Sequence, residues 1–212
     1  MIAGAAPASP LVRGAAAVVA VAAWAGLGLR LDVSWAATGD LSWAIWGMLR
    51  FFTIIANLFV AILFSGIALG RPRWSHPSLL GAVTLSILLV GIVFAALLSG
   101  LKILAGTALV ADVVMHKVVP VLVPIYWLAF APKGRLIAWD PVRWATVPLF
   151  YFVYVLARAR IDGKYPYFFF NVERIGWGGV MAYALAMAAG FLLVGFALVW
   201  LDRRLGRGVS LQ

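Results

Sequence analysis

Two pairs of polar residues interrupt apolar runs of the sequence, and their side chains are of the types that perform nucleophilic catalysis. Thr53 and Asn57 lie in the stretch RFFTIIANLF, and Asp112 and His116 lie in ADVVMHKVVP. Because each pair is spaced i, i+4, its two side chains share one face of a helix. A hydroxyl is a weak nucleophile that needs an adjacent base, and a neutral imidazole can be that base. The two pairs therefore predict a catalytic site, provided that Thr53 and His116 meet.

Each of these residues also has an ordinary structural interpretation. A threonine in an apolar helix commonly bonds the carbonyl four residues earlier, which here belongs to Leu49. An asparagine such as Asn57 commonly holds two membrane helices together. Asp112 can mark the boundary of an apolar run, whereas an ionisable His116 inside such a run is a functional candidate. The sequence leaves both interpretations open.

The composition predicts the environment in which these residues act. Of the 212 residues, 65% are hydrophobic and 11% are charged, whereas a soluble domain carries roughly 25% charged residues. The net charge of +10 is spread between apolar runs, so it forms no face for nucleic acid. There are no cysteines and only two histidines, His76 and His116, so we expect neither a metal site nor a haem or other cofactor. We predict an all-α integral membrane protein.

Six apolar runs, each near the roughly 20 residues that a membrane-crossing helix needs, predict one domain over residues 1–212, a bundle of six transmembrane helices. The runs lie near 12–31, 47–69, 79–101, 110–131, 144–158 and 178–201.

The distribution of Lys and Arg predicts the orientation. Basic residues concentrate at the two termini and in the even-numbered connections, and with the connection 158–177 set aside the opposite side keeps only Arg30, Arg50 and Lys102. By the positive-inside rule, both termini face the cytoplasm. The Ala-, Gly-, Arg- and Trp-rich composition is typical of a bacterial inner-membrane protein.

Thr53 and His116 are predicted to lie at matching depth. The spans 47–69 and 110–131 run in the same direction, because one antiparallel span separates them. Thr53 lies ~8 Å before the middle of its span, and His116 lies ~6–9 Å before the middle of its own. Both are therefore displaced toward the same, exoplasmic face. One helical turn away, Asp112 is the candidate to orient the imidazole, and Asn57 is the candidate donor to an oxyanion.

The connection 160–177, RIDGKYPYFFFNVERIGW, concentrates aromatic residues, among them Tyr165 and Tyr167. This density is typical of the membrane interface and favours an aromatic belt that anchors the neighbouring spans. The same segment could instead form a lid over a cavity at the polar pairs, with Tyr165 and Tyr167 as supporting residues. Both interpretations remain open at this point.

The string HKVVPVLVPIYWLAFAPKGRL (116–136), followed by WATVPLFYFVY and KYPYFFFNV, resembles the bacterial six-span branch of a membrane hydrolase family. That family includes the animal androgen-induced membrane protein and the androgen-dependent regulator of tissue factor pathway inhibitor. With FFTIIANLFV upstream, the resemblance covers residues 45–202. It departs at Tyr126-Trp127, where related bacterial sequences often carry an acidic residue before the tryptophan. The role of that acid is missing or reassigned here, and Tyr126 is therefore a candidate supporting residue.

The resemblance implies a function. The animal members are threonine hydrolases that cleave fatty acid esters of hydroxy fatty acids with an intramembrane threonine and histidine, so Thr53 would be the nucleophile and His116 its base. We therefore expect a membrane-embedded lipid ester hydrolase whose partners are membrane lipids and a lipid-ester substrate. The alternative is a non-catalytic lipid-binding or transport protein that uses the same polar cavity, and the absence of a GxSxG motif favours it.

Overall fold

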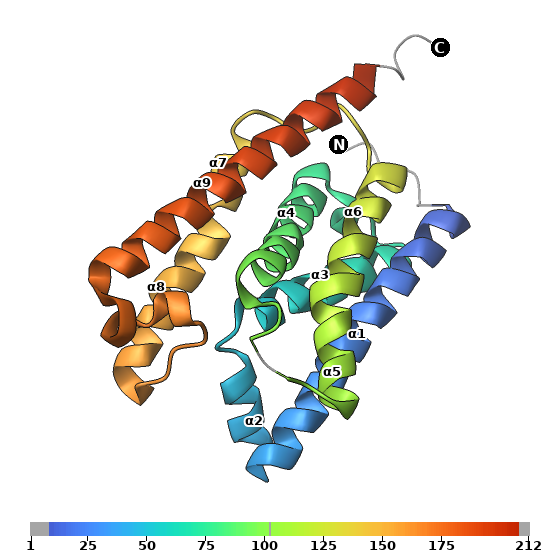
Figure 1. The fold of residues 1–212 in the computed structure, drawn as a ribbon. Coiled ribbons are helices and arrows are strands. Elements are labelled where there is room, and N and C mark those ends of the chain that lie inside the picture. The colour runs from blue at the N-terminus through green and yellow to red at the C-terminus, as the bar shows by residue number, and fades with distance from the viewer. Residues whose placement is uncertain (1–8, 102, 208–212) are drawn as a thin grey trace.

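The described part of the chain is helical apart from its connections (Figure 1), and it contains no strand. The computed structural model describes residues 9–101 and 103–207. Lys102, which entered the prediction of orientation, and both chain ends lie outside these residues. The cytoplasmic placement of the termini therefore stays a prediction.

The helices of the described residues follow one another in the order of Figure 1. They are α1 (Pro10–Thr38), α2 (Leu41–Met48), α3 (Phe52–Ala68), the 3-10 helix η1 (Pro72–Ser75), α4 (Pro77–Val93), the π-helix η2 (Phe94–Leu98), α5 (Gly106–Val113), the π-helix η3 (Val114–Val118), α6 (Val119–Phe130), α7 (Asp140–Trp144), α8 (Thr146–Asp162), the 3-10 helix η4 (Phe168–Phe170) and α9 (Val172–Arg207).

Four helical stretches of the described chain are long and apolar enough to cross a membrane: Pro10–Thr38, Pro77–Leu98, Gly106–Phe130 and Val172–Gly206. The pair α2 and α3 makes a fifth if the two bent helices count as one span. The run predicted near 144–158 falls on α8, which has 17 residues and is shorter than the roughly 20 residues of a full span. Five of the six predicted runs thus each coincide with one helical stretch, the run near 47–69 is divided between α2 and α3, and four or five runs have the length and hydropathy of a span.

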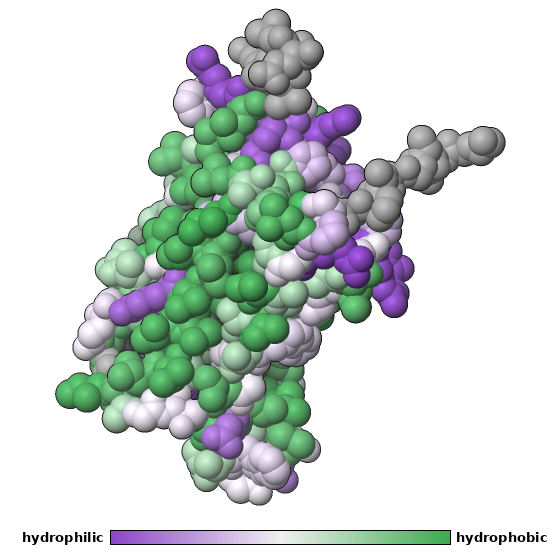
Figure 2. Space-filling model, turned by 90° about the vertical axis from the view of Figure 1, so that its right-hand side faces the viewer, coloured by the Kyte–Doolittle hydropathy of each residue, from purple (hydrophilic) through white to green (hydrophobic). Residues whose placement is uncertain are grey.

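The outer surface has the character expected of such helices. Large apolar side chains such as Phe150 (74% exposed) and Leu193 (73% exposed) point outward. Figure 2 shows apolar side chains over most of the visible face, with hydrophilic ones gathered mainly toward its upper end. Soluble monomers rarely expose contiguous apolar surface on this scale.

The packing of the helices places one group of elements around a common centre. Helix α1 lies along α3 and α5, α4 packs against both α3 and α6, and α9 packs against α4 and α7. The core includes the side chains where these helices meet, among them Phe64, Leu85 and Trp127. The ends of α3, α4 and α5 that lie near α2 surround the candidate site.

The second predicted span departs from the structure. The run near 47–69 is not one continuous helix, because the chain breaks at residues 49–51 and α2 and α3 meet at 97°. Thr53 therefore lies in the first turn of α3. The Leu49 carbonyl, which was the expected partner of Thr53 in a continuous helix, lies outside α3 and accepts a hydrogen bond from the Tyr154 hydroxyl at 3.3 Å.

Candidate active site

Thr53 and His116 lie in contact. The Thr53 Oγ1 atom is 3.1 Å from His116 Nε2. Thr53 is buried, with 6% of its surface exposed, and the His116 side chain is 13% exposed. Two residues that are 63 positions apart in the sequence are thus held at hydrogen-bonding distance in a largely apolar interior.

Asp112 completes a hydrogen-bonded line with these two residues. His116 Nδ1 is 3.0 Å from the Asp112 carboxylate Oδ1 and 3.1 Å from the Asp112 carbonyl oxygen. Both neighbours of Nδ1 are acceptors, so Nδ1 carries the imidazole hydrogen in the neutral ring. Nε2 is then the acceptor and takes the hydrogen bond that the Thr53 hydroxyl donates.

The local helical geometry around His116 has a cause in the sequence. Pro120 follows His116 by four residues, so it lacks the N–H that would bond the His116 carbonyl, and its ring would clash with that carbonyl in a regular α-helix. The chain opens into the wider π-turn η3 at this point. Pro120 fits because Gly91 of α4 faces it, and a Cβ on Gly91 would lie 2.9 Å from the proline ring. π-turns of this kind occur frequently at functional sites.

A second π-turn supports the imidazole from the other side. Helix α4 ends in η2, whose first residue, Phe94, stacks on His116 with ring centroids 4.3 Å apart and an interplanar angle of 18°. Stacking and the hydrogen bond that Nδ1–H shares between the two Asp112 oxygens together fix the plane of the ring. His116 therefore presents Nε2 to Thr53 in one orientation.

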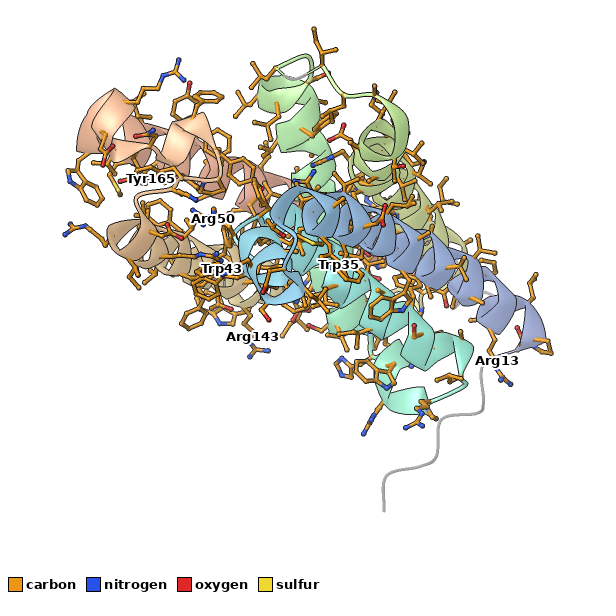
Figure 3. All side chains as sticks on the ribbon, turned by 90° about the horizontal axis from the view of Figure 1, so that it is seen from below. Arg13, Trp35, Trp43, Arg50, Arg143 and Tyr165 are labelled. Carbon is orange, nitrogen blue, oxygen red and sulfur yellow. The ribbon has the colours of Figure 1, made fainter. Side chains whose placement is uncertain are left out.

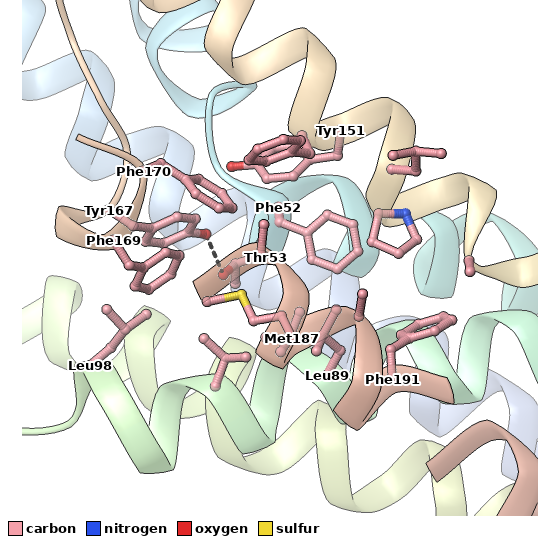
Figure 4. A pocket seen from close by; sticks show the side chains of 18 residues that line it. Phe52, Thr53, Leu89, Leu98, Tyr151, Tyr167, Phe169, Phe170, Met187 and Phe191 are labelled. Atoms are coloured by element: carbon pink, nitrogen blue, oxygen red, sulfur yellow. Dashed lines mark hydrogen bonds between the residues drawn. The ribbon is translucent and has the colours of Figure 1, made fainter. Parts of the chain in front are cut away.

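Tyr167 approaches Thr53 from the connection between α8 and η4. Its hydroxyl lies 3.5 Å from Thr53 Oγ1 (Figure 4). Burial raises the pKa of this phenol, so it stays protonated and remains a donor. The N–H groups of Phe52 and Thr53, in the first turn of α3, have no backbone acceptor within the described chain. Two unpaired N–H groups therefore lie in the same turn as the Thr53 hydroxyl, which the Tyr167 hydroxyl approaches.

The break between α2 and α3 is stabilised by side chains of α8. A helix end leaves carbonyl groups without partners. Tyr151 donates its hydroxyl to the Arg50 carbonyl at 2.8 Å, and Arg158 donates to the Trp46 carbonyl and to the Tyr154 hydroxyl. The Arg158 guanidinium also lies 3.8 Å above the centroid of the Trp46 ring. These contacts replace the backbone bonds that a continuous helix would make.

An ion pair ties this break to the connection that carries Tyr167. Arg50 donates to both carboxylate oxygens of Asp162, at 3.1 and 2.6 Å, and to the Lys164 carbonyl at 2.6 Å. Figure 3 shows Arg50 in this part of the molecule. Partial burial opposes ionisation of Asp162, but hydrogen bonds from Arg50 and from the Lys164 N–H hold its pKa below the ordinary value. Arg50 therefore positions Thr53, three residues later, relative to the connection.

We expect Asp162→Asn to destabilise the fold. The substitution leaves the buried guanidinium groups of Arg50 and Arg158 without their shared carboxylate, and breaking a buried pair in this way costs about 3 kcal/mol. The measurement is the thermal unfolding midpoint of the purified chain in detergent. Lys164→Gln is the control, because its side chain is exposed and only its backbone takes part. Equal midpoints for Asp162→Asn and wild type would show that the ion pair contributes nothing to the fold.

An apolar cavity of about 150 Å³ opens on one side of Thr53. It lies among α3, α4, α8 and α9 and is lined mainly by aromatic and aliphatic side chains, including Phe52, Leu89 and Phe191 (Figure 4). Thr53 and Tyr167 form part of its wall. The cavity is suited to a hydrocarbon chain that ends at the Thr53 hydroxyl.

A second cavity of about 220 Å³ opens on the other side of the same two residues. It lies among α1, α3, η2, α5 and η3, and its wall contains Arg30, Asp112 and His116 in addition to Thr53 and Tyr167. Its lining is more polar than that of the apolar cavity. A ligand that occupies both cavities must pass the Thr53 hydroxyl.

Of the two roles predicted for Asn57, a link between helices and an oxyanion donor, its contacts support the first. Asn57 is fully buried, and its Nδ2 donates to the Thr53 carbonyl at 2.8 Å and to the Met115 carbonyl at 3.4 Å. Both amide hydrogens are engaged behind the site, so Asn57 is not placed to donate to an oxyanion. It joins α3 to η3 and thereby holds Thr53 and His116 in register.

The remaining predicted residues divide between the site and its surroundings. Tyr167 is at the site, whereas Tyr126 and Tyr165 line neither cavity. Tyr126 is buried and packs edge-on against Phe64 at 4.8 Å, and Tyr165 packs on the core at the rim (Figure 3). The connection itself folds inward, with Phe169 and Phe170 buried, so it covers the cavities as a lid would rather than serving only as a belt.

Three charged residues of the site region were missed as functional residues in the sequence. In the sequence, charged residues such as these are typical of the regions where apolar runs end. Only their partners in the structure reveal the role of Arg50, Arg158 and Asp162. One signal was present, because Arg50 is a charged residue inside the apolar run near 47–69, three residues before Thr53. Among the described residues, no group of three or more His, Cys, Asp and Glu side chains is arranged to hold a metal ion.

No family model, no curated protein and no solved structure matches this chain. The arrangement of Thr53, His116 and Asp112 between the two cavities is thus the main evidence about function.

Proposed function

We propose that this protein is a membrane-embedded lipid ester hydrolase in which Thr53 is the nucleophile and His116 is the general base. The observation that carries the proposal is the hydrogen-bonded line from Asp112 through His116 to Thr53, at the point where the two cavities meet. This is the arrangement of a nucleophile, a base and an orienting acid that recurs on unrelated folds. The resemblance of the sequence to a threonine hydrolase family supports the same roles.

In the first step, the Thr53 oxygen attacks the ester carbon while its proton passes to His116 Nε2. The tetrahedral intermediate collapses, the bond between the carbonyl carbon and the alcohol oxygen breaks, and His116 returns the proton to the leaving alkoxide. Asp112 accepts the Nδ1 hydrogen bond throughout and stabilises the imidazolium that forms in between. The products of this step are an acyl-threonine and a free alcohol.

In the second step, water attacks the acyl-threonine, gives a proton to His116 Nε2 and releases the free acid. The Thr53 oxygen regains that proton, which returns the site to its initial state. The negative charge that develops on the carbonyl oxygen in both steps falls near the Tyr167 hydroxyl and the first-turn N–H groups of α3. Donors fixed in position before the reaction are an effective means of stabilising such an oxyanion, and the positive end of the α3 dipole adds to them.

A lipid ester fits the surroundings of the line. The apolar cavity receives one chain of the substrate, and a ligand of this kind can enter laterally from a bilayer. We place the site in a six-span bundle of a bacterial inner membrane, with the bent pair α2–α3 as one span, α8 as a short span and both termini in the cytoplasm. The site then lies toward the exoplasmic face, where water reaches it.

Covalent labelling tests this function directly. We expect an alkyl fluorophosphonate to label the purified wild-type chain in lipid nanodiscs, and mass spectrometry to locate the adduct on the peptide that contains Thr53. The same preparation is expected to hydrolyse a long-chain nitrophenyl ester. A non-catalytic lipid-binding or transport protein would take up the lipid without either reaction, and that result would contradict the proposal.

A further inference from the structure

A groove of about 290 Å³ lies between α4 and α9, and the reaction proposed above does not use it. Its lining residues lie between positions 85 and 97, on α4 and η2, and between positions 183 and 194, on α9. Among the described residues that line it, none carries a charge and only Tyr183 carries a hydroxyl group. We call this space the α4–α9 groove.

Helices α4 and α9 are in close contact at one end of the groove and separate along it (Figure 1). At Gly195 the packing is so close that a Cβ atom would lie 2.9 Å from Cδ2 of Leu85. At Gly190, by contrast, a Cβ atom would meet no described atom within 4 Å. Ile92, which lines the groove from α4, is 49% exposed. The groove is therefore open along its middle to the apolar outer surface of the helices.

The α4–α9 groove adjoins the apolar cavity that ends at Thr53. Four side chains line both spaces and form the partition between them: Leu89, Val93, Met187 and Phe191 (Figure 4). Methionine is unbranched and flexible, so a change in the rotamer of Met187 can join the groove to the cavity. The two spaces thus form adjacent parts of one apolar region.

The size of the apolar cavity limits how much of an acyl chain it can hold. A cavity of about 150 Å³ accommodates one benzene-sized group, or about six carbon atoms, and the apolar cavity has this volume. A longer chain whose ester lies at Thr53 must therefore continue beyond the cavity. The groove next to it has almost twice that volume. Because a polar ligand would find few hydrogen-bond partners there, the occupant that fits is a hydrocarbon chain.

We propose that the α4–α9 groove receives the distal part of a long acyl chain, and that Gly190 is a specificity-determining residue for the length of that chain. This inference rests on the proposed function. The first carbons of the chain fill the apolar cavity, and the remaining carbons pass Met187 into the groove. Gly190 keeps the groove open because it has no side chain. The open middle of the groove is also the place where the chain enters sideways from a bilayer.

Two nitrophenyl esters, one hexanoyl and one hexadecanoyl, test this inference with the full chain in lipid nanodiscs. We expect Gly190→Phe to lower kcat/KM for the hexadecanoyl ester by about 10- to 100-fold, the effect expected when an apolar site is overpacked. Turnover of the hexanoyl ester is expected to stay at the wild-type value, because its chain ends inside the apolar cavity.

Two control variants separate the length of the groove from general effects on α9. Ala189→Phe adds the same ring one residue away, at an exposed position that lines neither cavity nor the groove, and it is expected to leave both rates unchanged. Gly190→Ala adds only a methyl group and is expected to keep most of the hexadecanoyl rate. If Gly190→Phe lowers both rates equally, or leaves the hexadecanoyl rate unchanged, the inference is overturned.

Failure of the proposed function has a different signature, because neither ester would then be cleaved in a Thr53-dependent way. In that case hexadecanoic acid with a diazirine at the end of its chain probes the groove alone. We expect light to crosslink it to the groove residues Ile92 and Ala186, and excess unlabelled hexadecanoic acid to prevent this. Labelling of the exposed Ala189 measures the background from bulk lipid. Crosslinks that are lost in Gly190→Phe support the groove, whereas crosslinks that excess acid does not reduce overturn it.

Discussion

Thr53→Ala is expected to reduce ester turnover by about 10³- to 10⁶-fold, the loss seen when a nucleophile is removed from a site of this type. In the proposed mechanism the Thr53 hydroxyl supplies the oxygen of the acyl intermediate, and among the described residues no other serine or threonine lines either cavity. Tyr167 is the nearest candidate, but burial raises the pKa of its phenol and makes its ionisation still less favourable. The measurement is the steady-state rate on a long-chain nitrophenyl ester, together with loss of the fluorophosphonate adduct.

Two control variants make the Thr53 result specific. Thr53→Ser keeps a hydroxyl at the same position and is expected to retain much of the turnover and all of the labelling. Thr84→Ala removes a threonine that is equally buried, at 1% exposure on α4, but that lines neither cavity. It is expected to match the wild type. A Thr53→Ala variant that is as active as Thr84→Ala would rule out Thr53 as the nucleophile.

His116→Ala is expected to have the second largest effect, a loss of about 10³-fold or more in kcat. Without the imidazole, the Thr53 proton has no acceptor and the leaving alkoxide has no proton donor. Because the two residues act as one unit, the double variant with Thr53→Ala is expected to be no slower than the slower single variant. Asp112→Asn is expected to fall between wild type and His116→Ala, since it disturbs only the orientation and charge of the ring.

The other histidine of the chain is the matched control for His116. His76 is exposed and lies at the beginning of α4, so His76→Ala is expected to keep wild-type turnover. The same kinetic assay and a melting curve for each variant separate loss of chemistry from loss of fold. Losses that add in the double variant would show that Thr53 and His116 act independently, which contradicts the proposed mechanism.

The pairing of Thr53 with His116 could be predicted from the sequence because both residues are polar and interrupt long apolar runs. Their distances from the middle of each run are similar, and helices that cross a common layer bring equal depths together. The i, i+4 spacing also predicted Asp112 beside His116, because residues four apart share one face of a helix. For Asn57, the spacing predicted the face of the helix but not which carbonyl groups the side-chain amide meets.

The break before Thr53 could not be predicted from the sequence, because no residue type typical of a bend lies at the break itself. The stretch LRFFT contains neither proline nor glycine, which are the usual causes of a sharp bend. The bend depends on Tyr151, Tyr154 and Arg158, whose side chains take over the carbonyl groups of residues 46–50. Hydropathy says nothing about which charged side chains pair, so the ion pair of Arg50 with Asp162 was equally hidden.

Because the α2–α3 break depends on side chains of α8, the candidate site can form only after α8 has been synthesised. The contacts that shape the break join residues 101 to 112 positions apart in the chain. A ribosome that has released α1 to α6 has already delivered Thr53, His116 and Asp112, but not the side chains that bend the chain in front of the threonine. These three residues therefore remain without the α2–α3 break through most of synthesis. In the proposed hydrolase, reactivity would begin only when α8 and the connection after it have been made.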